Sequence, residues 1–349
     1  MIRQELHFDK QDLRYTGIIG TGGIGSGKFF RLNGDHTLGR EESRSGHFLD
    51  IRDYCKQHII LHYLKVLLGP AVSVIPVGKV GDDDIGNNLI SEMKATGMEM
   101  DYIEKLPDAS TLFSFCFSYP DHTGGNLTTD NSASAMVDPR YIKKAQDVIR
   151  KLGQRGIIMA APEVPLNARY RLLQLGMENG LFCTASFTSG EIRSALDSGF
   201  MNFIDLISLN LDEASALAGN STEGNDMIFT VNHAIRRLHG ANRNILVSIT
   251  AGMQGSFCWD GTTLNAWPAI ITKAISTAGA GDAFFSGLIC GLALGFHLFE
   301  AQQLATLLAG LSVTSPHTIH TGIDRSSLRD FMRSTDLLYS EKIIKILED

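Results

Sequence analysis

The sequence predicts an α/β protein with a central, mostly parallel β-sheet. Three observations lead to this prediction. Short apolar runs alternate with longer segments of helical periodicity, one run of period two breaks that alternation, and a glycine-rich turn joins a β-rich run to an apolar helix. Alternating strands and helices are typical of βαβ units, which place parallel strands in one sheet with helices on its faces.

The five predicted core strands are apolar along nearly their whole length, as expected for strands that helices cover on both faces. They occupy residues 15–20, 71–77, 156–160, 203–209 and 244–249. Helical patterns occupy residues 54–68, 86–96, 140–152 and 167–175. Gly97 and Gly176 are expected to end the second and the fourth of these helices.

Residues 111–119 differ from the core strands because aromatic residues alternate strictly with other residues. The aromatic positions are Phe113, Phe115, Phe117 and Tyr119. This period of two predicts a half-exposed antiparallel strand. The turn-rich segment 120–125 then leads into residues 126–129, so a hairpin is expected.

Composition limits the class of protein. The chain has 349 residues, of which 44% are hydrophobic and 20% charged, as in ordinary globular proteins. Its net charge of −7 argues against a nucleic-acid or membrane-surface partner. Five scattered cysteines without a CxxC pair indicate reduced thiols, and no segment has the pattern of a leader or a membrane span. We therefore expect a cytoplasmic protein.

The segment 276–287, STAGAGDAFFSG, carries the strongest chemical signal. Gly279, Ala280 and Gly281 lie at the start of a helix, where small residues and unpaired backbone N–H groups favour an anionic ligand. Asp282 would repel an anionic ligand, so simple binding of an anion does not explain a carboxylate at this position. Its position makes sense if the carboxylate accepts a proton from a nucleophile while the amides stabilise a transferring phosphoryl group.

This segment resembles the C-terminal signature of the ribokinase-like (PfkB) kinases of sugars and nucleosides, Asp-Thr-x-Gly-Ala-Gly-Asp. The match runs from Thr277 through Asp282 and includes Phe284. The resemblance extends over nearly the whole chain and implies one three-layer α/β/α domain, residues 1–349, with a β lid from about 21–50 and 100–130. It also implies ATP- and Mg²⁺-dependent phosphorylation of a hydroxyl on a small sugar or sugar derivative, with dimerisation through the lids in many relatives.

Two further motifs resemble the nucleotide side of this family. Asn210 and Glu213 match an Asn-x-x-Glu element that organises Mg²⁺ and its waters, although the same two residues could form a helix capping box. Thr250, Gly252 and Gly255 match a Thr-x-Gly-x-x-Gly element that lines the ATP phosphates, although a plain hairpin turn is the alternative. The resemblance adds Thr277 to the expected ATP contacts.

The substrate side departs from the family pattern. Relatives usually carry an Asp after the first strand, where this chain has Gly25-Ser26-Gly27. Asp35, Asp50 and Asp53 are candidate replacements by their proximity in sequence. Glu163 matches a family Glu-x-Pro element near the transfer site.

Another departure concerns cations. Ser276 replaces the first Asp of the signature, which argues against the monovalent-cation site that some relatives have.

The sequence is also compatible with other functions. A nucleoside kinase would need a base-stacking pocket, which the aromatic face at residues 113–117 could supply. A non-catalytic sugar-sensing relative would explain the altered substrate motifs. The GxGxxG pattern at residues 20–25 fits a dinucleotide fingerprint, but residues 33–35 and Gly39 interrupt the helix that a Rossmann unit requires.

Overall fold

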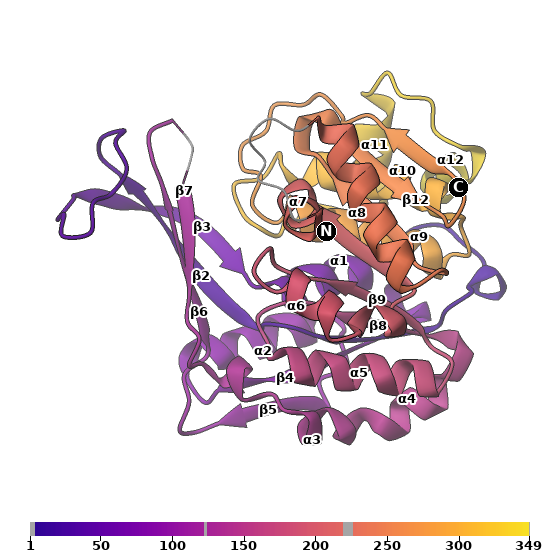
Figure 1. The fold of residues 1–349 in the computed structure, drawn as a ribbon, viewed down its shortest axis with the longest axis horizontal. Helices are drawn as coiled ribbons and strands as arrows, with labels where there is room; N and C mark the ends of the chain where they lie inside the picture. The colour runs from indigo at the N-terminus through magenta and orange to yellow at the C-terminus, as the bar shows by residue number, and fades with distance from the viewer. Residues whose placement is uncertain (1–3, 122–123, 219–225, 349) are drawn as a thin grey trace.

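The computed structural model describes residues 4–121, 124–218 and 226–348, which form two β-sheets and the helices around them (Figure 1). The large sheet has nine strands in the order β13-β12-β11-β10-β9-β8-β1-β4-β5. The pairings from β5 to β11 are parallel, whereas β12 and β13 pair antiparallel at one edge. The prediction of a mostly parallel central sheet is confirmed.

The strands of the large sheet are short, apolar and mostly buried. They are β1 (Gly17–Thr21), β4 (Ser73–Gly81), β5 (Tyr102–Leu106), β8 (Gly156–Ala160), β9 (Phe182–Ser186), β10 (Leu206–Asn210), β11 (Leu246–Thr250), β12 (Ser256–Trp259) and β13 (Leu264–Trp267). Every residue of β1 and β8 is buried, as expected for central strands with helices on both faces.

Two separate hydrophobic cores show that helices cover both faces of this sheet, so the molecule has three layers. One core contains residues of α1 (Lys56–Leu68), α2 (Asp84–Thr96), α9 (Ala280–Ala293), α10 (Leu298–Ser312), α11 (Arg325–Arg333) and α12 (Glu341–Glu348). The other contains residues of α3 (Pro139–Ile142), α4 (Gln146–Leu152), α5 (Leu166–Glu178), α6 (Ile192–Asp197), α7 (Leu211–Ala218) and α8 (Met227–Ala241).

The helix boundaries differ from expectation at two places. Gly97 ends α2 in a left-handed conformation, as predicted, but α5 continues through Gly176 to Glu178. A side chain at Gly176 would come within 2.5 Å of Ile158 on β8, so this glycine permits close packing of helix on strand. The helix expected over residues 140–152 is two helices with a 3₁₀ turn between them.

A second sheet projects from the body as a lid (Figure 1). Its strands are β2 (Gly25–Leu32), β3 (Gly46–Tyr54), β6 (Leu112–Ser118) and β7 (Gly124–Thr128), in the order β3-β2-β6-β7. The expected hairpin of β6 with β7 is present and antiparallel, but β6 pairs with β2 in parallel. Alternation alone cannot reveal that second partner. Residues 102–106 lie in the large sheet as β5.

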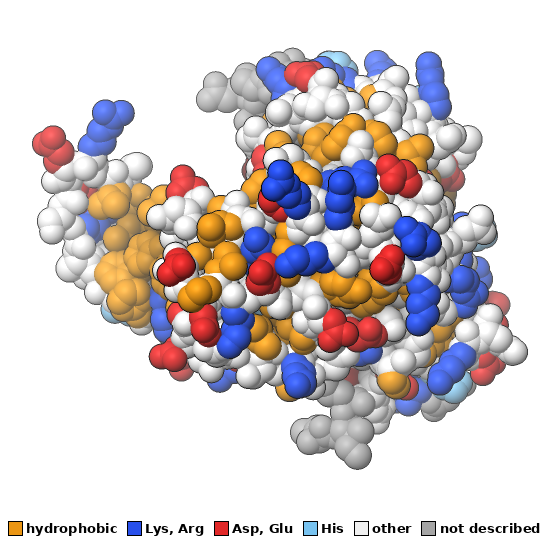
Figure 2. Space-filling model, turned by 90° about the horizontal axis from the view of Figure 1, so that it is seen from below, with side chains coloured by type: hydrophobic (Ala, Val, Ile, Leu, Met, Phe, Trp, Pro, Cys, Tyr) orange, Lys and Arg blue, Asp and Glu red, His pale blue; other side chains and the backbone are white. Residues whose placement is uncertain are grey.

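The two faces of the lid differ in chemistry. The rings of Phe30, Phe48 and Phe115 pack together with centroids 5.1–6.4 Å apart. Phe48 is 62% exposed and Leu127 is 63% exposed, and hydrophobic side chains gather on the projecting lid in Figure 2. Ser114, by contrast, is buried and lines a cavity on the other face. The lid therefore has an apolar outer surface and a more polar inner one.

The start of the chain excludes the dinucleotide-binding alternative. After β1 the chain enters β2 of the lid, so the glycines at residues 20–25 join two strands and do not lead into a helix.

All five cysteines are unpaired. Across the part of the chain that the structure describes, no helix has both the length and the apolar character that a membrane crossing requires.

Candidate active site

Three cavities meet where α9 begins, beyond the carboxyl ends of β8, β10 and β11. A cavity of about 840 Å³ lies under the lid, one of about 400 Å³ lies against α10, and one of about 190 Å³ lies between them. Asp282 lines both the lid cavity and the central cavity, and Gly281 lines both the central cavity and the third one. Open α/β sheets bind their ligands at this end of the strands.

Glycine is required at the start of α9. Gly279 is the N-cap with φ of 80°, and a Cβ there would lie 2.5 Å from the carbonyl oxygen of Thr318. A Cβ at Gly281 would meet nothing within 4 Å, so the backbone there is open to a ligand. The N–H of Ala280 already donates to the carbonyl of Thr277 at 3.2 Å. Gly279 and Gly281 are consequently better candidates than Ala280 for binding a phosphoryl oxygen.

Asp282 lies in the first turn of α9 and faces Lys56, the first residue of α1. The Lys56 Nζ is 3.7 Å from Asp282 Oδ1, and the two side chains are 35% and 14% exposed. Burial raises the pKa of Asp282, while the Lys56 ammonium lowers it. In turn, Asp282 raises the pKa of Lys56 above its usual range, so the lysine remains charged. Lys56 is a site residue that the motif analysis missed.

Glu163 fixes the start of α1 from the loop after β8. Its Oε2 accepts a hydrogen bond from the backbone N–H of Lys56 at 3.0 Å. Glu163 has a φ of 76°, and among the described non-glycine residues no other has a positive φ. Burial raises the pKa of this carboxyl to about 7, against the lowering effect of Lys56. Glu163 thus lines the lid cavity and also positions Lys56.

Asn210 and Glu213 form the capping box that the sequence allowed. The N–H of Asn210 donates to Glu213 Oε2 at 2.9 Å, and the N–H of Glu213 donates to Asn210 Oδ1 at 2.8 Å. Both residues line the central cavity, where burial raises the pKa of Glu213 to about 7.

The donor set here fits a magnesium ion held partly through water. Each oxygen of the box that accepts a backbone N–H keeps a further lone pair, and Mg²⁺ prefers such oxygen ligands and retains several waters. Within residues 4–121, 124–218 and 226–348 there is no group of three His, Cys, Asp or Glu that could hold a metal without such help.

The 400 Å³ cavity contains the rest of the predicted nucleotide residues. Thr250 is the last residue of β11, and Gly252 and Gly255 follow it in the turn to β12 with φ of 56° and 91°. The segment is therefore a hairpin turn and also a cavity wall. The opposite wall is apolar and includes Phe284, Ala309, Gly310 and Val313. Thr277 contributes to this cavity and to the lid cavity.

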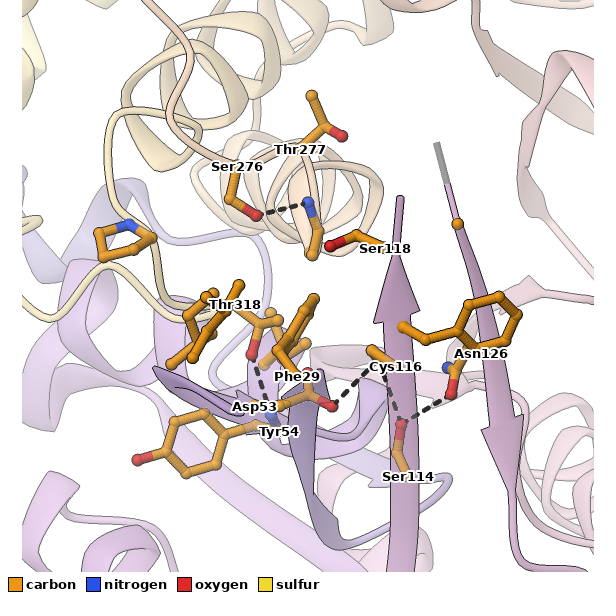
Figure 3. A pocket seen from close by; sticks show the side chains of 18 of the residues that line it. Phe29, Asp53, Tyr54, Ser114, Cys116, Ser118, Asn126, Ser276, Thr277 and Thr318 are labelled. Carbon is orange, nitrogen blue, oxygen red and sulfur yellow. Dashed lines mark hydrogen bonds between the residues drawn. The ribbon is translucent and has the colours of Figure 1, made fainter. Parts of the chain in front are cut away.

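The lid cavity brings Asp53 into the site and leaves two other predicted residues outside. Asp53 is 7% exposed, and its carboxylate lies among Cys116, Ser114 and Thr318 (Figure 3). Asp35 and Asp50 are exposed and do not line the cavity. Leu49, Ile51 and Asp53 share the inner face of β3, so Asp50 falls on the opposite face.

The aromatic face of β6 contributes little to this cavity. Phe113 and Phe115 do not line it, whereas Phe117 does, together with Phe29 of β2. The stacking pocket considered for a nucleoside base is therefore not built from the whole 113–117 face.

Comparison with known proteins identifies the family. The sequence profile of the pfkB family carbohydrate kinases matches residues 60–324. A deoxyribokinase of Salmonella typhi is 25% identical over 245 residues, which are 70% of this chain and 77% of that one. A ribokinase of Bacillus subtilis is 26% identical over 244 residues, 69% of this chain and 75% of that one.

Solved structures show the same fold. Ribokinase from Giardia lamblia superposes with a TM-score of 0.78 at 16% identity, covering 91% of this chain and 98% of that one. Arabidopsis thaliana ribokinase complexed with ribose and ATP superposes with a TM-score of 0.72 at 18% identity, covering 91% and 99%. The family match begins at residue 60, after β2 and β3, so the departures expected on the substrate side lie in the unmatched part. From the profile match, the fold and the signature at the start of α9, we conclude that this chain belongs to the pfkB family of carbohydrate kinases.

Proposed function

We propose that this protein transfers the γ-phosphoryl group of ATP to a hydroxyl of a small sugar or sugar derivative, with Asp282 as the general base. The observation that carries the proposal is the position of Asp282 between the lid cavity and the central cavity. A hydroxyl bound under the lid and a phosphate bound at the start of α9 would meet at this carboxylate. Relatives named ribokinase and deoxyribokinase support the acceptor class.

The proton moves from the sugar hydroxyl to Asp282 as the oxygen attacks the γ-phosphorus in line, while the bond from this phosphorus to the β–γ bridging oxygen breaks and ADP leaves. For this step the carboxyl must be ionised, and the Lys56 ammonium at 3.7 Å favours the ionised form against the effect of burial. The same ammonium is placed to offset negative charge that gathers near the reacting oxygens. Lys56 therefore has an electrostatic part in the reaction, and Glu163 holds it in place through the backbone.

The start of α9 stabilises the transferring group. The N–H groups of Gly279 and Gly281, with the positive end of the helix dipole, would stabilise the charge that grows on the phosphoryl oxygens. Thr250 and Thr277 offer hydroxyls to the remaining phosphates. The apolar wall against α10 suits the flat face of a purine base, which supports ATP as donor.

Asn210 and Glu213 would hold Mg²⁺ through water. The ion supplies charge neutralisation on the phosphates and aligns them for transfer. Glu213 is half-buried and lines the central cavity, where its carboxylate oxygens suit this role. A monovalent cation is not part of the proposal, because Ser276 stands where the family signature has an aspartate.

The lid offers a surface for a homodimer. Phe48 and Leu127 are more than half exposed on its apolar outer face, and apolar patches of this kind mark association sites. Two lids from two copies could cover these side chains.

The test of the proposed function is ADP release from Mg²⁺–ATP over a panel of pentoses, hexoses, polyols and nucleosides. Release that depends on one acceptor class supports the kinase and names its substrate. A nucleoside as the best acceptor would favour the nucleoside kinase alternative. Calorimetric binding of ATP and a sugar without any release would point instead to a sensor.

A further inference from the structure

The inner face of the lid contains a buried carboxylate that no motif explains. Asp53 on β3 lies opposite Gly27 on β2, and a Cβ at Gly27 would lie 2.0 Å from Asp53 Oδ2. The carboxylate thus occupies the space that any side chain at position 27 would fill. The glycine on β2 therefore makes room for a carboxylate from the neighbouring strand β3.

Two hydrogen bonds and one close contact connect Asp53 with two other lid strands (Figure 3). The Cys116 thiol on β6 donates to Asp53 Oδ2 at 3.7 Å, and Ser114 lies 3.6 Å from the same sulfur. The Ser114 hydroxyl donates to Asn126 Oδ1 on β7 at 2.8 Å. Because Asn126 Oδ1 accepts this bond, the N–H groups of the same amide remain to donate to a ligand. Asp53 accepts and Asn126 donates on one wall of the cavity.

The charges near Asp53 disfavour an anionic ligand. Burial raises the pKa of Asp53, and the groups that lower it are the neutral side chains of Ser114, Cys116 and Thr318 and the N–H of Tyr54. Among the described residues no ion pair includes Asp53. Glu163 is close enough to Asp53 and Asp282 for both carboxylates to raise its pKa.

Two cations line the lid cavity, but neither balances Asp53. Lys56 is paired with Asp282. Arg31 donates to the carbonyl of Pro120 at 2.9 Å and lies roughly 13 Å farther along β2 than Gly27. The end of the cavity at Asp53 therefore has an excess of negative charge.

We infer that Asp53 determines the specificity of the lid cavity. Its carboxylate accepts hydrogen bonds from the hydroxyls of an uncharged polyol and repels the carboxylate of a sugar acid. This inference rests on the proposed function and narrows its substrate class. A hydroxyl can donate to Asp53 while it accepts from Asn126, whereas a carboxylate would meet a buried like charge. β3 ends at Tyr54 and α1 begins at Lys56. Asp53 and Lys56, which pairs with Asp282, therefore lie on one short stretch of chain.

The experiment compares alditols with aldonates of the same carbon skeleton, which differ only in a terminal hydroxymethyl or carboxylate group. The wild type is expected to favour the alditol by about 100-fold in kcat/KM, and Asp53→Asn to reduce this preference at least about tenfold, mainly through KM. Gly27→Ala, whose methyl group would displace the carboxylate without removing it, should reduce the preference as well. Asp50→Asn, on the opposite face of β3, is the matched variant and should keep the wild-type preference.

Thermal melting of each variant separates a loss of folding from a loss of recognition. Calorimetric binding of the same pair of compounds gives the preference even without turnover, so failure of the kinase reaction would overturn the proposed function and not this inference. Equal use or binding of alditol and aldonate by the wild type would overturn the assignment of Asp53. So would an unchanged preference in folded Asp53→Asn.

Discussion

At the scale of single residues, the site depends on two carboxyl groups, Asp282 and Glu163, whose pKa burial raises and one lysine lowers. Lys56 faces Asp282 through its side chain and Glu163 through its backbone. Sequence motifs identified the two acids because each follows a recognisable turn. They missed Lys56, since its contact with Asp282 joins α1 to α9 and no local pattern records such a contact.

Lys56→Gln should move the acidic limb of the pH profile. Because the ammonium lowers the pKa of Asp282, its removal raises that pKa, and the base is protonated over a wider range. We expect the acidic limb of kcat/KM to shift upward by about 1–2 pH units. Lys105→Gln, which removes a lysine from an exposed pair with Asp82, is the control and should leave the limb in place. An unshifted limb in Lys56→Gln would show that the lysine does not act on the base.

Glu163→Gln should weaken the pH dependence of stability. The pKa of Glu163 is about 7 in the folded protein against 4.5 for an ordinary glutamate. The folded state therefore holds a proton that the unfolded chain releases, and stability falls as pH rises from about 4.5 to 7. The glutamine cannot titrate, and its carbonyl can still accept the N–H of Lys56. We expect the fall in unfolding free energy between pH 5 and pH 8 to shrink by roughly 1–3 kcal/mol, measured by urea denaturation. Equal falls in both proteins would contradict the raised pKa.

At the scale of elements, the beginning of α9 combines a required glycine with an open one. Gly279 has a positive φ and no room for a Cβ, whereas Gly281 has neither constraint. Gly279→Ala should lower the unfolding free energy by about 1–3 kcal/mol, while Gly281→Ala should change it by less than about 1 kcal/mol. Thermal and urea unfolding measure both. Equal destabilisation by the two substitutions would mean that the turn tolerates a side chain at 279.

The sequence was most informative where a signal is local. The apolar runs predicted the core strands, and the glycine-rich turn predicted the strand-to-helix junction with Asp282 in its first turn. It was least informative in the lid. Whether Asp50 or Asp53 faces the cavity depends on the pairing of β3 with β2, whose register shifts between Gly27 and Phe29. The exposed Asp35 and Asp50 looked equivalent to Asp53 because proximity in sequence says nothing of this register.

At the scale of the whole molecule, the two halves of the site have different origins in the chain. The family match covers the part that holds Asn210, Thr250 and Asp282, and it begins after β2 and β3 of the lid. The nucleotide side therefore follows the family pattern, while β2 and β3, which carry part of the substrate side, lie outside the matched residues. Gly27 and Asp53 lie on these two strands.

The apolar outer face of the lid predicts self-association. A double substitution, Phe48→Ser with Leu127→Ser, should weaken a wild-type dimer by at least about tenfold in dissociation constant, because each of these side chains is more than half exposed and needs a partner to be buried. Met177→Ser, at an exposed position on α5, is the control. Sedimentation velocity at micromolar concentration measures the change. A wild type that is monomeric throughout this range would contradict the prediction.

The central claim is that Asp282 is the base of a phosphoryl transfer between the lid cavity and the nucleotide cavity. Its most direct test is ADP release by the wild type and by Asp282→Asn with the best acceptor, beside calorimetric binding of ATP. We predict that the variant binds ATP within about twofold of the wild type, while kcat falls by roughly 10²–10⁴-fold. Substrate-dependent turnover that is equal in the two proteins would contradict the account.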